Sequence, residues 1–292
     1  MTLIKNIVIM LVVLMMVFFM FTRTGVHAKN SDRYFKTLQE SLIKEGFDKN
    51  TIIGLYNNPK VYFETRKASL FLMHREAVLN YDQFSSPENI QKSRNYMTRH
   101  KTDLLRAEKQ YGVNKEIITA IILIETKLGD RLGGPSVLNM LSTVTSLKDP
   151  NVRDIFWDKI SKSTDFTKTK FQKWAERKSK WAYNELKAFL IYTTREKMDP
   201  VRIYGSYAGA MGIAQFMPSN ILTFAKDGNN DGRVDLFNHS DAITSIASYL
   251  KHYGWHSGIK GKRAVNVIYR YNHSRPYADA VLKVAALLKS ET

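Results

Sequence analysis

Residues 114–129 have the sequence NKEIITAIILIETKLG, in which apolar side chains would lie on nearly every side of a helix. Asn114 is a favourable N-cap and Gly129 a favourable stop, so a helix is predicted from residue 115 to residue 128. A helix that is apolar all round has to be buried. This segment therefore predicts the central core helix of a mainly α protein.

Glu125 continues the most apolar stripe of this helix, since it follows Ile121 and Ile122 by four and three residues. An ionised carboxylate is costly there unless it is paired or has a chemical role. Burial and the nearby negative end of the helix dipole should both raise its pKa, as a general acid near neutral pH requires. A salt bridge to Lys127 or Arg131 would satisfy the same carboxylate, so these residues alone leave both interpretations open.

A second candidate segment is the loop GSYAGAMG at residues 205–212, which is rich in glycine and alanine. Small residues let a backbone and a ligand approach each other closely. The loop leads into AQFMPS at residues 214–219, where Gln215 offers a donor and an acceptor to sugar hydroxyl or N-acetyl groups. Considered alone, the segment is explained equally well by a tight turn between helices.

Three ordered motifs resemble those of the membrane-bound lytic murein transglycosylase B family. They are Glu125-Thr126 followed by Gly129, then GAMGxxQFMPS at residues 209–219, then YNxSxxYAxAV at residues 271–281. The resemblance extends over roughly residues 35–290 and implies a lysozyme-like helical core. In that family a single glutamate is the catalytic carboxyl, which corresponds here to Glu125.

The resemblance also implies a groove for the glycan strands of peptidoglycan and a reaction without water. The side chains that it places along the groove are Ser206, Gln215, Tyr249, Asn272 and Tyr277. Glu125 would protonate the oxygen that joins N-acetylmuramic acid to N-acetylglucosamine. The resulting carboxylate would then take the proton of the muramic C6 hydroxyl as that oxygen attacks C1, leaving a 1,6-anhydro end.

Two other functions fit the same residues. A hydrolytic muramidase would use a second carboxylate, such as Asp130 or Asp199, to activate water. A non-catalytic wall-binding protein would keep the groove and lose the acid, but Glu125 is present. Mass spectrometry of the released muropeptides would distinguish the transglycosylase, which leaves 1,6-anhydro ends, from the muramidase, which leaves reducing ends.

An acidic loop at residues 227–241 is a separate signal. Its first, third, fifth and seventh positions are those of an EF-hand-like loop, but Asn238 stands at the twelfth, where a bidentate glutamate is usual. The resembling family has a longer loop whose last ligand follows the first by fourteen residues. The resemblance therefore implies a structural Ca²⁺ with ligands from Asp227, Asn229, Asp231, Arg233 and Asp241. An Asx turn is the alternative, and the chemistry itself requires no cofactor.

The N-terminus has the layout of a secretory signal. Lys5 precedes the apolar run 7–21, and small residues lead to a cleavage site after Ala28. An uncleaved membrane anchor is the alternative, although fifteen apolar residues are fewer than the roughly 20 of a membrane span. We therefore expect export to the periplasm or cell envelope. The predicted organisation is a signal or anchor at 1–28, an N-terminal helical region at 29–100 and a catalytic domain at 101–292.

The amino-acid composition narrows the class of molecule that the chain can bind. Lys and Arg number 44 against 27 Asp and Glu, a net charge of +17 spread along the whole chain. Such a surface attracts polyanions, but expected export and the lack of a recognisable nucleic-acid-binding motif argue against nucleic acid. No cysteine is present, which excludes disulfides and thiol catalysis. Helices are predicted within residues 31–58, 87–111, 174–195, 241–253 and 274–289.

Overall fold

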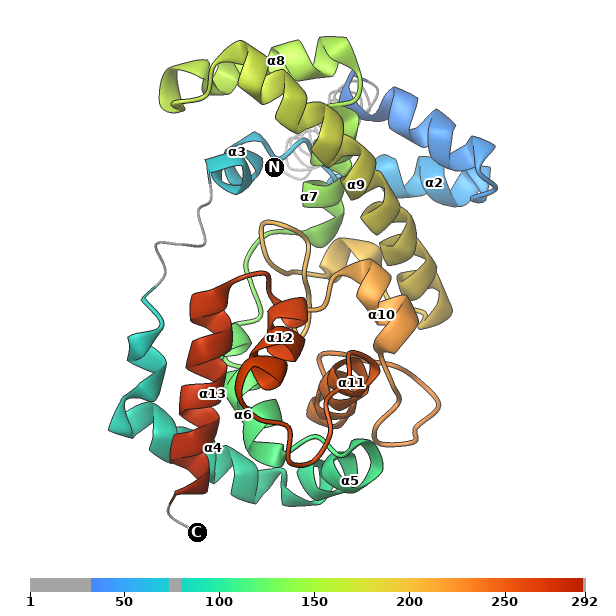
Figure 1. Cartoon of the computed structure of the whole chain (residues 1–292). Coiled ribbons are helices and arrows are strands. Elements are labelled where there is room, and N and C mark those ends of the chain that lie inside the picture. The colour runs from blue at the N-terminus through green and yellow to red at the C-terminus, as the bar shows by residue number, and fades with distance from the viewer. Residues whose placement is uncertain (1–32, 74–79, 291–292) are drawn as a thin grey trace, which may run out of the picture. The chain divides into compact units, whose positions relative to one another are not determined.

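The computed structural model describes residues 33–73 and 80–290, so the predicted signal segment at 1–28 lies outside the described residues. Within those two ranges the regular elements are all helices, accompanied by isolated bridges such as Gly205 with Met211. The predicted mainly α fold is confirmed (Figure 1). None of the described helices is long and apolar enough to cross a membrane.

The chain forms two compact units, and each unit combines two separate stretches of sequence. The first unit holds residues up to Ala68 and Leu138–Tyr183, and the second holds Ser69–Val137 and Asn184–Thr292. The domain boundary expected near residue 100 coincides with none of the three divisions, which follow Ala68, Val137 and Tyr183. It lies inside the second unit, because helices from both sides of it pack together there.

The first unit has an aromatic core. Phe156 stacks on Phe171 with ring centroids 5.8 Å apart, and the Tyr56 hydroxyl hydrogen-bonds the Ser142 hydroxyl at 2.8 Å. Its helices, some of which continue into the second unit, are residues 33–44, α2 (Lys49–Tyr56), α3 (Thr65–Met73), α7 (Val137–Ser146), α8 (Pro150–Ile160), η3 (Ser161–Ser163) and α9 (Lys168–Arg195).

The second unit is built around the predicted core helix, α6 (Lys115–Thr126). Ile118, Ile121 and Ile122 are completely buried, and α6 packs against the helices around it (Figure 1). These neighbours and the remaining elements of the unit are η2 (Asp82–Ser85), α4 (Pro87–Arg99), α5 (Lys101–Tyr111), η4 (Pro200–Arg202), α10 (Pro218–Phe224), α11 (His239–His252), α12 (Gly261–Tyr271) and α13 (Arg275–Lys289).

Local signals explain most helix ends, with one exception. The Ser274 hydroxyl accepts the backbone N–H of Tyr277 and caps α13, and Gly112 ends α5 with a φ of +69°. The single amphipathic helix predicted over residues 87–111 is wrong, because α4 and α5 are separated at His100. The His100 ring packs between the rings of Tyr96 and His239, each with centroids 4.4 Å away. Tertiary packing therefore accompanies a break that has no glycine or proline signal.

Candidate functional site

Glu125 is the penultimate residue of α6, and its side chain is partly exposed at the end of an otherwise buried helix. The hydroxyl of Tyr277 donates a hydrogen bond to Glu125 Oε1 at 2.7 Å. Tyr277 lies in the first turn of α13, which packs along α6. The packing of these two helices therefore brings together two residues that are 152 positions apart.

Two tyrosines lie near enough to Glu125 for its charge to affect their pKa values. Burial, followed by the negative charge of Glu125, raises the pKa of Tyr277 well above its ordinary value. The same two causes raise the pKa of Tyr271, whose ring stacks on Tyr277 with centroids 6.4 Å apart. Tyr277 therefore stays protonated near neutral pH and acts as the donor to Glu125.

The chain turns away sharply after the carboxylate. Lys127, Leu128 and Gly129 follow α6 with φ values of +50°, +64° and +96°, a left-handed run. The backbone N–H of Leu128 donates to the Ile122 carbonyl at 3.2 Å, which closes the helix in a Schellman-type end. A Cβ at Gly129 would lie 2.8 Å from Cε1 of His239, so the turn is also sterically restricted.

Thr126 ties this helix end to the small-residue loop. Its side chain is completely buried, accepts the backbone N–H of Gly129 at 3.1 Å and donates to the Ile213 carbonyl at 3.2 Å. The backbone N–H of Ile213 donates to the Leu236 carbonyl at 2.8 Å, and the Tyr271 hydroxyl donates to the Ala214 carbonyl at 2.6 Å. The loop backbone is thus held from three directions beside Glu125.

The two polar side chains predicted in this loop bond mainly to the loop itself. Gln215 has a φ of +47°, and its Nε2 donates to the carbonyls of Gly212 at 2.9 Å and Leu132 at 3.3 Å. The Ser206 hydroxyl accepts the backbone N–H of Ala210 at 3.0 Å. Both side chains are partly exposed, and both stabilise the tight loop in this structure.

Tyr249 and Asn272 approach the site from α11 and α12. Tyr249 is buried, its hydroxyl donates to the Arg270 carbonyl at 2.5 Å, and its ring lies edge-on to Tyr271 at 5.1 Å. Asn272 is the partly exposed C-cap of α12, directly after Tyr271. The structure thus places Glu125, Tyr277 and the Gln215 loop in one connected cluster. Tyr249 does not contact Glu125 in that cluster but packs against the ring of Tyr271.

The acidic loop folds around two carboxylates. Asp227 accepts the backbone N–H groups of Asp231 and Gly232 at 3.2 and 2.8 Å. Asp241 accepts those of Gly228 and Asp235 at 2.8 and 2.7 Å. Burial raises the pKa of Asp241, backbone hydrogen bonds partly offset this effect, and the charge of Asp227 adds to it. Two acidic groups are therefore held close together.

This donor set agrees in part with the expected cation site. The Asn238 side chain, at the twelfth position of the loop, accepts the backbone N–H of Ser240 and caps α11. This position therefore stabilises the start of a helix in this structure. Across residues 33–73 and 80–290, no group of three or more His, Asp or Glu side chains is arranged to hold a metal ion. A cation would therefore need backbone and amide oxygens, as from Arg233 and Asn229, beside the two carboxylates.

Glu125 and the loop around Gln215 lie inside a region that matches a known sequence family, and Tyr277 follows that region. Residues 30–267 match the Transglycosylase SLT domain. The chain belongs to this SLT-domain family.

Individual SLT-domain relatives show the same relationship. Membrane-bound lytic murein transglycosylase B of Escherichia coli is 34% identical over 176 residues, which are 60% of this chain and 41% of that protein. The match therefore spans less than half of the length of that relative. Soluble lytic transglycosylase SltB1 of Pseudomonas aeruginosa is similar in structure, with a TM-score of 0.69, 25% identity, and coverage of 88% of this chain and 98% of that one.

Two further SLT-domain structures are similar in fold. Escherichia coli lytic transglycosylase Slt35, solved in complex with calcium, has a TM-score of 0.70 at 24% identity and covers 89% of this chain and 92% of its own. SltB3 of Pseudomonas aeruginosa, solved in complex with NAG-anhNAM-pentapeptide, has a TM-score of 0.70 at 18% identity, with coverage of 89% and 80%. These likenesses confirm the lysozyme-like, mainly α fold.

Sequence reasoning missed three residues of this site. Thr126 and Tyr271 lie within the motifs quoted above, but no role was expected for either. Tyr81 carries no motif, and its ring packs edge-on against Tyr277 with centroids 6.1 Å apart. Only the fold brings Tyr81 to the cluster.

Proposed function

We propose that this chain is a lytic transglycosylase that cleaves peptidoglycan glycan strands, with Glu125 as its catalytic acid and base. The observation that carries the proposal is the Tyr277 hydroxyl at 2.7 Å from Oε1 of Glu125, a residue inside the region that matches the SLT domain. The hydrogen bond orients a carboxyl group at the end of a rigid, buried helix. Orientation of this kind is a main source of enzymatic rate.

The reaction uses one carboxyl twice. Glu125 first donates its proton to the oxygen of the bond between N-acetylmuramic acid and N-acetylglucosamine, and that bond breaks. The Glu125 carboxylate then takes the proton of the muramic C6 hydroxyl while that oxygen bonds to C1, so the acid is regenerated and the product ends in a 1,6-anhydro ring. The donor from Tyr277 stabilises the charged carboxylate between the two steps.

We assign the substrate contacts to the loop and to the C-terminal end of α12. Gln215 and Ser206 contribute polar side-chain atoms at the loop, and Asn272 contributes an amide directly after Tyr271 at the end of α12. These three partly exposed residues are assigned to the sugar hydroxyl and N-acetyl groups. Tyr249 supports them from behind, through its contact with Tyr271.

A hydrolytic muramidase is the main alternative, and the candidate second carboxylates have other surroundings. The Asp199 carboxylate accepts the backbone N–H of Val201 and caps η4. Asp130 is exposed beyond the left-handed turn after α6. The single-carboxyl reaction, in which the substrate supplies its own nucleophile, is therefore favoured.

The test is mass spectrometry of the fragments released from purified wall. A transglycosylase releases muropeptides with 1,6-anhydro ends, which are lighter by one water than reducing ends. Anhydro products from the wild-type protein are the expected result. Reducing ends would identify a hydrolase, and no release at all would identify a binding protein.

We infer also that the loop at residues 227–241 binds Ca²⁺ as a structural ion. Asp227 and Asp241 lie close enough for the charge of one to raise the pKa of the other, and a bound cation would neutralise both. Asn229, Asp231 and the Arg233 carbonyl complete the proposed ligand set. The calcium complex of the similar structure Slt35 supports this assignment.

The cell envelope is the proposed location. The apolar N-terminal segment has the layout of a signal or an anchor, and a relative carries the name membrane-bound. Detergent extraction of cell fractions, followed by N-terminal sequencing of the mature protein, distinguishes a cleaved signal from an uncleaved membrane anchor. Protein recovered only from the cytosol would overturn it.

A further inference from the structure

The first half of α9 carries a row of positive charges on its exposed side. This row, the basic stripe, consists of Lys170, Lys173, Arg177 and Lys180. Its members are three or four residues apart, so they lie within about 80° of the helix circumference and along about 15 Å of its length. The other side of the helix is buried, where Phe171 stacks on Phe156 of α8 with centroids 5.8 Å apart. The basic stripe therefore faces away from the core of the first unit.

The described part of the chain does not neutralise the basic stripe. Lys168 Nζ lies 3.0 Å from Asp154 Oδ1, and Arg153 Nη1 lies 3.8 Å from Glu176 Oε1, so these neighbouring acids already have partners. No acid that the structure describes forms an ion pair with a member of the stripe. Like charges three and four residues apart repel each other and destabilise a helix. An anionic partner would remove this repulsion.

Trp181 lies at the end of the basic stripe, one helical turn after Arg177. Its ring is partly exposed, and Lys178 Nζ lies 4.6 Å from the ring centroid. Tryptophan is enriched at the boundary between lipid headgroups and hydrocarbon, because its ring is apolar and its N–H is polar. Lys and Arg on the polar face beside such a ring are typical of helices that bind anionic membranes.

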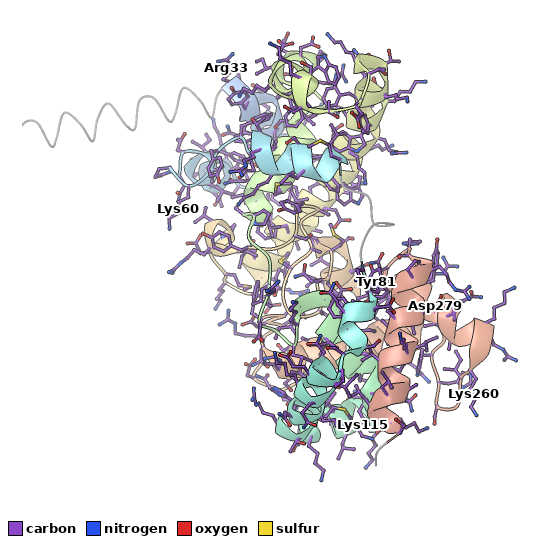
Figure 2. The ribbon with its side chains drawn as sticks, turned by 90° about the vertical axis from the view of Figure 1, so that its left-hand side faces the viewer. Arg33, Lys60, Tyr81, Lys115, Lys260 and Asp279 are labelled. Atoms are coloured by element: carbon purple, nitrogen blue, oxygen red, sulfur yellow. The ribbon has the colours of Figure 1, made fainter. Side chains whose placement is uncertain are left out.

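The sequence order brings the same unit close to the expected membrane segment. Residues 22–32 separate the apolar run 7–21 from Arg33, which begins the described part of the first unit (Figure 2). An extended chain of this length spans at most about 40 Å, so an anchor at 7–21 would hold the unit beside the bilayer. A tether of this kind raises the effective concentration for a weak surface contact.

We propose that the basic stripe docks the first unit on a bilayer surface that is rich in anionic phospholipid. The cations bind the phosphate groups of lipid headgroups, and Trp181 enters the interface beside them. A row of charges on one side of a helix fits a planar surface that presents many phosphates. A second copy of the chain does not fit, because two basic stripes repel each other, and the expected export argues against nucleic acid. The contact is additional to the reaction proposed for Glu125 and does not depend on it.

The test uses the absence of cysteine from the chain. Thr169→Cys, at an exposed position beside Lys170, carries a single environment-sensitive fluorophore on the full chain. The labelled protein is titrated with vesicles of phosphatidylglycerol mixed with phosphatidylcholine, and with vesicles of phosphatidylcholine alone. The N-terminal segment can enter either vesicle, so the second titration measures its contribution. We expect a fluorescence shift with the anionic vesicles alone, and its loss at high salt.

Two double variants then locate the contact. Lys173→Gln with Arg177→Gln removes two cations of the stripe and should weaken binding by about 30-fold, because each lost cation weakens such a contact by about fivefold. Lys36→Gln with Lys44→Gln is the matched control, since both are exposed lysines on the helix at residues 33–44 of the same unit. The control should keep the wild-type affinity, and equal Tm values should show that both double variants are folded.

An equal response to the two kinds of vesicle, or equal affinities in the two double variants, would overturn the proposal. A shift of the same label on purified wall but not on anionic vesicles would also overturn it and would identify a wall-docking surface. Glu125→Gln should bind the vesicles as the wild type does. Loss of docking and loss of the proposed reaction are therefore separate results.

Discussion

At the scale of single residues, the proposed chemistry depends on one carboxyl group and one hydroxyl group. Tyr277 holds a proton that it does not readily lose, because burial and the charge of Glu125 raise its pKa. Glu125 has to hold a proton in one step and release it in the next. Tyr277 therefore remains protonated and donates a hydrogen bond throughout the reaction, whereas Glu125 alternates between its protonated and ionised forms.

Glu125→Gln should reduce glycan cleavage by about 10²–10⁴-fold, because removal of an acid/base group has this typical effect. The glutamine keeps the shape of the side chain and loses only the titratable proton. Cleavage is measured as released anhydro product. Wild-type folding and wall binding serve as the controls, and more than about a tenth of the wild-type rate in the variant would contradict the assigned role.

Tyr277→Phe should reduce the rate by about 10–100-fold, because a hydrogen bond to a charged group contributes about 1.5–3 kcal/mol. The donor favours the ionised carboxylate. Its loss should therefore shift the alkaline limb of the rate profile, where Glu125 loses its proton, to higher pH. A pH–rate profile checks the direction, and Tyr269→Phe, at an exposed tyrosine on α12, is the matched control. A uniform fall in rate with no shift would indicate a purely structural role.

The sequence was informative about Glu125 and uninformative about its partner. A carboxylate in a run of isoleucines stands out locally, because burial makes it costly. The role of Tyr277 as its donor could not be predicted, since that contact depends on how α13 lies against α6 across 152 positions. Tyr81 could not be predicted for the same reason.

At the scale of elements, the small-residue loop is limited by its neighbours. Gly212→Ala should lower stability by about 1–2 kcal/mol for the left-handed backbone and by about 1–3 kcal/mol more for overpacking. Gly212 has a φ of +72°, and a Cβ there would lie 2.6 Å from the Leu236 carbonyl oxygen. Gly254→Ala is the control, because Gly254 has a φ of +96° and open space around it. Urea midpoints at constant m compare the two variants, and equal losses would show that the contact with Leu236 is unimportant.

The acidic loop should make stability depend on calcium. A calcium concentration a hundredfold above the dissociation constant stabilises the folded state by about 2.7 kcal/mol, seen as a higher Tm. Asp231→Ala should remove that gain, whereas Asp158→Ala, at an exposed acid of α8, should keep it. Equal Tm values in calcium and in chelator would show that the loop is a turn that binds no calcium.

The gain from calcium should also increase with pH. Asp241 has its pKa raised above the ordinary 3.8, so without metal its contribution to stability is present below that value and is lost as pH rises through the folded-state pKa. The ionised form is the one that binds a cation. The difference in Tm between calcium and chelator should therefore be smallest near pH 4 and larger at neutral pH.

Helix positions were predictable to the extent that local chemistry decides them. The core helix was expected from the isoleucine run and the N-cap of α13 from Ser274. Asn114 stands at the N-cap position of α6 as expected, but its side chain makes no capping hydrogen bond. The division of residues 87–111 at His100 was not, because it depends on ring packing against α11. The early start of α9 at Lys168 was also missed, since its first turns are highly basic.

At the scale of the whole molecule, the charge of +17 should act in docking rather than in turnover. Binding to intact wall should weaken steeply as salt rises, because exposed charges are screened over about 8 Å at physiological ionic strength. Cleavage of a short uncharged muropeptide analogue should change much less, since the sugar contacts are short-ranged. Both are measured from low to high salt. A parallel fall would show that the charge acts inside the groove.

The interleaved order of the two units has a consequence for how the protein is made. Helix α6 packs on α13, yet roughly 150 residues separate Thr126 from Arg275. A ribosome adding about 5–20 residues per second needs roughly 7–30 s to supply that partner. During this interval the isoleucine-rich helix that carries Glu125 has no native cover from α13. The nascent chain should therefore depend on a holding chaperone, and the Glu125 carboxyl gains its tyrosine donor only after the first turn of α13 has been synthesised.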